Sequence, residues 1–151
     1  MTLLRSYRSV RLSIVRERAD EPYLREAGCV AQLCRAVLGD DPREGFLAVY
    51  LDNRHRVLAV HRVSIGTCDG VTVHPREVFG PGLQLGAQAI VVAHNHPSGD
   101  PTPSSEDRMA TERLRQAGQI LGVELLDHVV IGAARYFSFA DEAIHPFQQK
   151  G

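Results

Sequence analysis

The residues best suited to chemistry lie where a run of apolar residues gives way to a polar loop. His94 and His96 stand two positions apart, directly after the segment Ala-Ile-Val-Val-Ala at residues 89–93. In an extended chain, residues i and i+2 project from the same face, so both imidazoles can approach one ion. Asp107 follows in the first turn of the next expected helix, from which a carboxylate can turn back toward the strand end.

Two imidazoles and one carboxylate leave the fourth position of a tetrahedral zinc ion open to water, which is typical of a catalytic zinc site. A structural zinc site would use cysteines, but Cys29, Cys34 and Cys68 include no C-x-x-C pair and are odd in number. They also indicate no disulfide framework. The pattern therefore predicts one Zn²⁺ per chain, held by His94, His96 and Asp107.

Ordinary structural roles account for parts of this pattern. A histidine at a strand end is usually a surface residue. Ser104, followed three residues later by Asp107, has the spacing of a capping box that begins a helix. The cap and the metal site are compatible, because the residue that fixes the helix start also fixes where Asp107 points. Structural roles alone do not explain a histidine pair, a Pro/Gly loop and a helix-borne acid in that order.

Hydrophobic periodicity predicts the elements that position these residues. Strands are expected at 8–15, 45–51, 56–65, 71–73, 88–93, 123–131 and 135–139, the fifth buried on both faces. Helices are expected at 23–38, ended by Gly39, at 76–85, interrupted or kinked at Gly80-Pro81-Gly82, and at 104–121. The mixed order predicts an α/β (α+β) fold with one mixed β-sheet flanked by helices. Cys29 and Cys34 fall among apolar residues of the first helix, where a free thiol behaves as a small hydrophobe.

Composition limits the classes of function. A chain of 151 residues with 44% hydrophobic content suits a single domain, expected over residues 1–151. A net charge of −1 gives no overall footprint for nucleic acid. The first segment is rich in arginine, which we interpret as the solvated face of an edge strand, although a local DNA-binding patch stays open. Its arginines are Arg5, Arg8, Arg11, Arg16 and Arg18.

The expected location is the cytoplasm. The three unpaired cysteines suit a reducing compartment. No apolar run has the length of a signal peptide or of a membrane span, so we expect no membrane association. The sequence does not indicate an oligomeric state.

The motif His-x-His, seven residues, Ser, two residues, Asp resembles the signature of the JAMM/MPN (JAB1-type) metalloprotease family. Residues 74–79, 93–104 and 126–132 are similar to its RadC-like branch. The resemblance covers about residues 43–140, preceded by an N-terminal strand–helix extension over 1–42. Full-length RadC proteins carry an N-terminal helical domain of a DNA-binding type. This chain has no room for it, so we expect a short form.

The resemblance implies a mechanism. A zinc-activated water would hydrolyse an amide bond, with a glutamate as general base and the Ser104 hydroxyl bonded to the developing oxyanion. Glu44, directly ahead of the strand at 45–51, matches the family's glutamate. Glu77 is the rival and is nearer to the histidine pair in sequence. His128 is interpreted as a buried or edge histidine bonded to backbone and not as a fourth ligand.

Three other functions compete with a metallopeptidase or isopeptidase acting on protein or peptide. A cytidine deaminase has a related-looking scaffold, but its H-x-E and P-C-x-x-C signature is absent here. A DNA-directed activity stays open because RadC is associated with DNA repair, yet the charge around the motif does not support it. A non-catalytic scaffold is disfavoured by the complete set of expected ligands.

Overall fold

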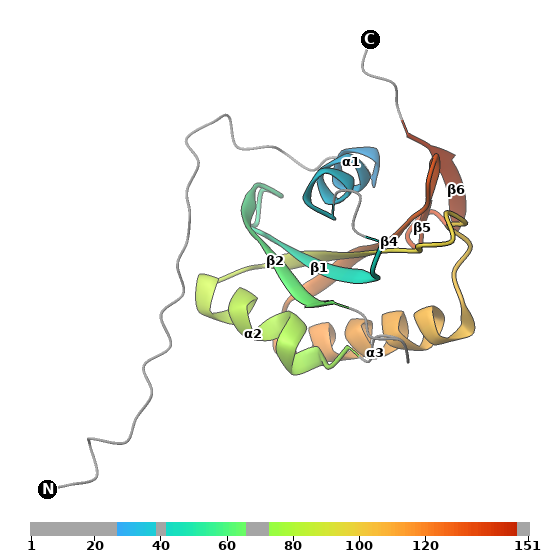
Figure 1. Cartoon of the computed structure of the whole chain (residues 1–151). Helices are drawn as coiled ribbons and strands as arrows, with labels where there is room; N and C mark the ends of the chain where they lie inside the picture. Colours follow the sequence, from blue (N-terminus) through green and yellow to red (C-terminus); the bar gives the residue numbers. More distant parts are fainter. Residues whose placement is uncertain (1–26, 39–41, 66–72, 148–151) are drawn as a thin grey trace, which may run out of the picture.

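The computed structural model describes residues 27–38, 42–65 and 73–147. These residues form a six-stranded sheet, which lies between helices (Figure 1). The strand order is β2-β1-β3-β4-β5-β6. The strands are β1 (Gly45–Leu51), β2 (Val57–Ile65), β3 (Ala89–Asn95), β4 (Glu124–Ile131), β5 (Arg135–Ser138) and β6 (Ala143–Pro146). The helices are α1 (Ala27–Leu38), α2 (Pro75–Leu85) and α3 (Ser105–Leu121). The predicted mixed α/β class is confirmed.

Several predictions fall on other parts of the chain. The strand at 8–15, the arginine-rich segment, the first residues of the helix at 23–38, Gly39 and Cys68 lie outside the described residues. So do Val71 and Thr72 of the third predicted strand, and Val73 is not in a strand.

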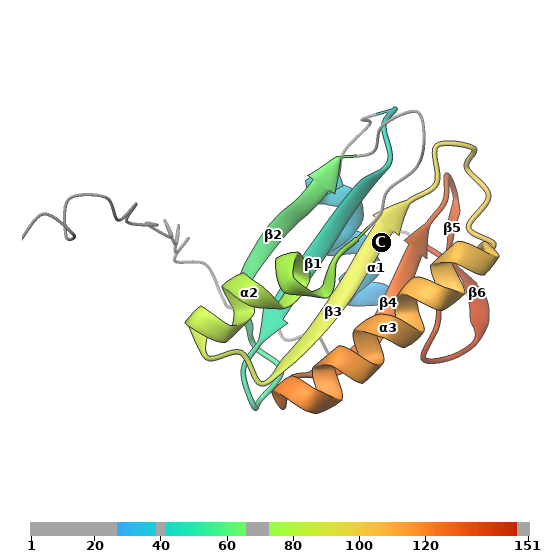
Figure 2. The same ribbon diagram turned by 90° about the horizontal axis from the view of Figure 1, so that it is seen from below.

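Alternating side chains in the central strands explain the three layers. Leu47, Val49 and Leu51 of β1 pack with Ala89, Val91 and Ala93 of β3 in the core beneath α1. The residues between them, such as Ala48, Tyr50, Ile90 and Val92, face the core shared with α2 and α3. Figures 1 and 2 show α1 on one face of the sheet and α2 and α3 on the other. The prediction that the apolar strand before His94 is buried on both faces is confirmed.

The neighbours of β3 set the position of the histidines. β3 pairs antiparallel with β1 and parallel with β4, and α3 supplies the crossover between the parallel strands. His94 continues the series Ile90, Val92 and therefore faces the α2/α3 side. α3 lies on that side (Figure 2), and Asp107 in its first turn comes within 3.1 Å of His94.

Two predictions about the elements are corrected. The helix is not interrupted at Gly80-Pro81-Gly82, because α2 continues through Pro81 to Leu85. The Tyr50 ring packs against Gly82, and Tyr50 Oη donates to Val78 O at 2.6 Å. A sixth strand, β6, was not predicted. It pairs Ala143–Pro146 with β5 at the sheet edge.

The two described cysteines differ in environment. Cys34 lies in the core, and burial raises the pKa of its thiol to about 12, so it is the expected small hydrophobe. Cys29 lies on the exposed side of α1, where the expectation of an apolar environment was wrong. No helix within the described ranges combines the length and apolarity needed to cross a membrane.

Candidate metal centre

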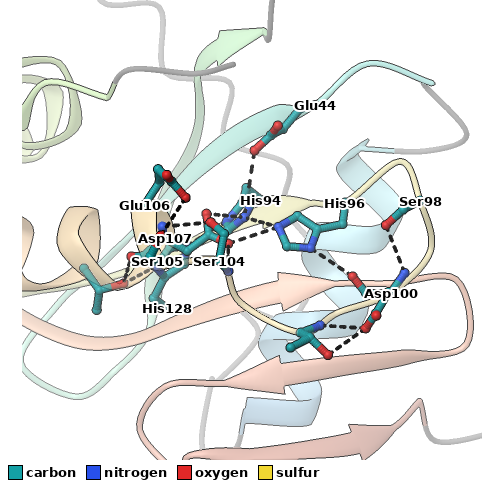
Figure 3. A network of polar contacts seen from close by, with 12 residues as sticks. Glu44, His94, His96, Ser98, Asp100, Ser104, Ser105, Glu106, Asp107 and His128 are labelled. Carbon is teal, nitrogen blue, oxygen red and sulfur yellow. Dashed lines mark hydrogen bonds and ion pairs between the residues drawn. The ribbon is translucent and has the colours of Figure 1, made fainter. Parts of the chain in front are cut away.

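Four polar side chains from separate parts of the sequence meet at the end of β3 (Figure 3). Glu44, His94, His96 and Asp107 each offer one ligand atom, and these atoms lie within 4.8 Å of one another. Glu44 comes from the segment before β1, His94 from β3, His96 from the loop after it, and Asp107 from the first turn of α3. This group could hold a metal ion.

The donor atoms of three residues have nearly the spacing of a tetrahedral zinc site. His94 Nε2 lies 3.0 Å from His96 Nε2 and 3.1 Å from Asp107 Oδ1, and His96 Nε2 lies 3.1 Å from Asp107 Oδ2. Zinc–ligand bonds of 2.0–2.2 Å at tetrahedral angles separate ligand atoms by about 3.3 Å. The two imidazoles and the Asp107 carboxylate therefore need only small shifts to bind one ion.

The start of α3 fixes the carboxylate. Ser104 is the N-cap: its Oγ accepts from the Asp107 backbone N–H at 3.1 Å, and the Ser104 N–H donates to Asp107 Oδ2 at 2.8 Å. The predicted capping box is thus confirmed in both of its bonds. Asp107 thus completes the cap of α3 and also faces the two histidines. The cap and a metal site are therefore compatible, as expected.

The loop after β3 fixes His96. Its Nδ1 lies 2.9 Å from the Asp100 carbonyl oxygen, which can only accept, so Nδ1 carries the proton of the neutral ring. Nε2 then presents a lone pair toward the Asp107 carboxylate. Asp100 is itself held by bonds from the Thr102 N–H and hydroxyl at 2.9 and 2.7 Å.

His96 Nε2 with its lone pair, His94 Nε2 and the Asp107 carboxylate lie 3.0–3.1 Å apart, and a cation between them would relieve the repulsion of these electron-rich atoms. The shifted pKa values of His96 and Asp107 result from the same closeness of these groups. The pKa of His96 is raised, because a proton added at Nε2 forms a hydrogen bond with Asp107. Burial alone would raise the pKa of Asp107, but hydrogen bonds with His94 and His96 outweigh it and hold that pKa well below its usual range. The donor set therefore attracts positive charge, and it fits a metal ion.

Glu44 lies at the outer side of the group. Its Oε1 is 3.9 Å from His94 Nε2, farther than the other three donors are from one another. Asn95 holds the backbone on both sides of it: Asn95 Oδ1 accepts from the Gly45 N–H at 2.7 Å, and Nδ2 donates to the Arg43 carbonyl at 3.0 Å. Glu77, the rival candidate, lies exposed in the first turn of α2 and is not part of the group.

His128 was predicted correctly as buried but wrongly as bonded to backbone through its ring. It is 1% exposed, with Nε2 2.7 Å from His94 Nδ1 and Nδ1 2.6 Å from Thr111 Oγ1. Burial lowers the pKa of His128, so its ring is neutral. Sequence reasoning missed Thr111 and Asn95, although Asn95 stands between the two predicted histidines.

The comparisons with known proteins agree with this geometry. Residues 24–144 match the RadC-like JAB domain. The chain belongs to this family. A RadC-like JAB domain is what the motifs around His94 and His128 resembled. The resemblance to RadC-like proteins that was noted in the sequence is therefore confirmed.

Several curated relatives of this RadC-like chain are called UPF0758 proteins. That of Thermotoga maritima is 49% identical over 100 residues, 66% of this chain and 45% of the relative. Those of Actinobacillus pleuropneumoniae serotype 5b and Methanosarcina mazei are 43% and 46% identical, over 85% and 68% of this chain. They are covered over 56% and 45% of their own length, so the chain spans about half the length of these relatives.

Proposed function

We propose that this RadC-like chain is a zinc-dependent metallohydrolase that cleaves an amide bond in a protein or peptide. The observation that carries the proposal is the convergence of His94 Nε2, His96 Nε2 and the Asp107 carboxylate at 3.0–3.1 Å, with Glu44 beside them. His94, His96 and Asp107 would hold one Zn²⁺. When bound, zinc would lower the pKa of a water to about 7 and polarise the scissile carbonyl.

Glu44 is the proposed general base. Its Oε1 stands 3.9 Å from His94 Nε2, so the carboxylate is close enough to accept the proton of a water bound beside the group. Glu44 takes the proton of the attacking water and passes it to the leaving amine. The bonds between Asn95 and the residues on either side of Glu44 hold the backbone from which this carboxylate extends.

Ser104 is the proposed oxyanion donor. The Asp107 N–H already occupies one lone pair of its hydroxyl oxygen, and the hydroxyl hydrogen is shared with the Glu106 carboxylate, from which it would turn toward a substrate. Such donors typically contribute ~3 kcal/mol to transition-state stabilisation. Because Ser104 also caps α3, its hydroxyl is positioned before any substrate arrives.

The chemistry of the site favours an amide over a phosphodiester. A site that grips a nucleic-acid backbone needs clustered cations, and a two-metal nuclease needs further bridging carboxylates. Between Ile90 and Met109 the one cation is Arg108, against Asp100, Glu106 and Asp107. Arg135 lies close enough to act electrostatically on Asp100, so cations from elsewhere in the chain do approach the loop.

The deciding experiment tests zinc-loaded protein against a peptide library, isopeptide-linked substrates and DNA. We expect amide cleavage that requires zinc and disappears in His96→Ala. A folded Arg113→Ala variant, altered on the exposed side of α3, is the control and should cleave like the wild type. Zinc-dependent scission of DNA that is lost in His96→Ala, without cleavage of any peptide or isopeptide, would overturn the proposal.

A further inference from the structure

A buried chain of hydrogen bonds connects the backbone of Asp107 with the ring of His94. Thr111 Oγ1 lies 2.7 Å from the Asp107 carbonyl oxygen and 2.6 Å from His128 Nδ1, and His128 Nε2 lies 2.7 Å from His94 Nδ1. Thr111, His128 and His94 are 2%, 1% and 2% exposed. Water therefore has little access to these bonds, and the protein groups themselves decide where each proton lies.

The direction of each hydrogen bond in this chain follows from the acceptor at one end, the Asp107 carbonyl oxygen. A carbonyl oxygen cannot donate, so the Thr111 hydroxyl donates to Asp107 O. Its hydrogen is then used, and its oxygen must accept from His128 Nδ1–H. A neutral histidine has one N–H, so His128 Nε2 carries a lone pair and accepts from His94 Nδ1–H. His94 is left with a lone pair on Nε2, the atom that faces His96 and Asp107.

We propose that Thr111 and His128 are positioning residues that fix His94 in the tautomer able to bind a metal. The inference rests on the metal site of the proposed function and adds two residues to it. The opposite tautomer would place a proton on His94 Nε2, where a ligand needs a lone pair. A histidine ligand whose second nitrogen donates to a fixed acceptor is oriented and made more basic.

The surroundings of His128 fit a positioning role. Its ring stacks on Phe139 with centroids 4.9 Å apart and planes 11° from parallel, and its backbone N–H donates to Asp127 Oδ1 at 2.7 Å. Asp127 in turn accepts from the Ser138 hydroxyl and the Ala140 N–H, at 2.7 and 2.9 Å. The ring is thus held from β5 and the turn after it as well as from β4.

Asp107 takes part at both ends of this arrangement. Its carboxylate faces His94 Nε2, and its carbonyl sets the proton on His94 Nδ1 through Thr111 and His128. The first two turns of α3 therefore determine both the position of one expected ligand and the tautomer of another. A shift of α3 against β4 would disturb both together.

Zinc affinity, measured by competition with a chromogenic chelator, tests the proposal. Thr111→Val removes the hydroxyl at nearly constant volume, and we expect zinc binding to weaken ~10–100-fold, the usual cost of losing such a partner. Thr111→Ser keeps the hydroxyl and should bind like the wild type. Tyr50→Phe is the matched control, since it removes another buried hydroxyl bonded to a helix carbonyl, away from the site, and should leave affinity unchanged.

Nitrogen-15 NMR of the histidine rings in alkaline, zinc-free buffer gives a readout independent of metal. We expect Nδ1–H tautomers for His94 and His128 in the wild type, and loss of the pure Nδ1–H form of His94 in Thr111→Val. Thr111→Ala carries the same test if the valine variant does not fold. Wild-type protein with Nε2–H on either ring, or hydroxyl-less variants that keep full zinc affinity, would overturn the inference. Absence of zinc binding by the wild type would instead remove the proposed function, and the ring tautomers would still test the proton arrangement.

Discussion

At the scale of single residues, Asp107 combines two tasks that substitutions can separate. Asparagine keeps a side-chain oxygen that can accept from the Ser104 N–H but loses the charge that attracts a cation. We expect Asp107→Asn to lose zinc binding but to keep the cap, whereas Asp107→Ala should lose zinc binding and also a further ~1 kcal/mol of stability through the broken cap. Urea unfolding and zinc titration measure the two effects. Equal zinc affinity in Asp107→Asn and the wild type would contradict the expectation.

The two glutamates can be distinguished in the same way. Glu44→Gln removes the proposed base while leaving His94, His96 and Asp107 in place, so we expect zinc retention with a loss of turnover of ~10²–10⁴-fold. Glu77→Gln lies outside the group and should retain most activity. Zinc content by elemental analysis and turnover of the cleaved substrate are compared in both variants. The reverse pattern would give the role of base to Glu77.

At the scale of elements, the loop after β3 is held by a close approach to the β4–β5 turn. The Ala133 N–H donates to the Gly99 carbonyl at 2.9 Å, and a Cβ at Gly132 would lie 2.5 Å from that carbonyl and 2.9 Å from Arg135 O. Backbone contacts this short cannot be relieved by side-chain movement. The turn therefore helps to fix the loop that carries His96 and Asp100.

Gly132→Ala should accordingly push the loop away from the turn. We expect a loss of stability of ~1–3 kcal/mol and weaker zinc binding, because the Asp100 carbonyl that orients His96 moves with the loop. Thermal unfolding and zinc competition measure these changes. Gly80→Ala, where an added Cβ meets nothing within 4 Å, is the control and should leave zinc binding unchanged. A Gly132→Ala variant that binds zinc like the wild type would show that the loop is held by other contacts.

The sequence allowed the local part of the site to be predicted and not the tertiary part. Alternation along β3 and the cap at Ser104 are short-range patterns, and they were sufficient to bring His94, His96 and Asp107 together. The partners of His128 depend on how α3 packs against β4, which no spacing in the sequence indicates. Glu44 was chosen through a family resemblance. β6 is a four-residue, partly exposed edge strand, too short to produce a clear alternating pattern.

At the scale of the whole molecule, metal binding would be linked to folding. Zinc that binds the folded chain and not the unfolded one stabilises it by ~2.7 kcal/mol at a free concentration 100 times the dissociation constant. We expect one zinc per chain by elemental analysis and a higher melting temperature after reconstitution. Neither effect should appear in His94→Ala/His96→Ala. Reconstituted wild-type protein without bound metal would contradict the expected stoichiometry.

Asp127 predicts a pH dependence of stability that does not involve the metal. Burial raises its pKa above the ordinary 3.8, against the lowering effect of bonds from Ser138, Ala140 and His128. Between 3.8 and the raised value, the folded state keeps a proton that the unfolded state releases, so this contribution to the free energy of unfolding decreases as pH rises. The stabilising contribution of Asp127 is fully present below pH 3.8, and it no longer changes with pH above the raised pKa.

Asp127→Asn does not titrate and isolates this effect. In urea unfolding with a chelator present, the stability of the wild type minus that of Asp127→Asn should decrease as pH rises through the window and then level off. Ser138→Ala removes one donor to the same carboxylate and should steepen the decrease, because that bond favours the charged form. A difference that increases with pH would mean that hydrogen bonding outweighs burial at Asp127.

The place of β3 between β1 and β4 has a consequence for the order of events during folding. β1 and β2 can pair early, since only a short connection separates them, but β3 pairs parallel with β4 across α3 and closes a longer loop. The two histidines reach Glu44 only when β3 has joined β1, and His94 reaches His128 only when β4 has joined β3. Zinc should therefore bind during refolding only when the central sheet is complete. In a stopped-flow experiment with a chromogenic chelator, we expect the rate of zinc binding to equal the rate of the slowest folding phase.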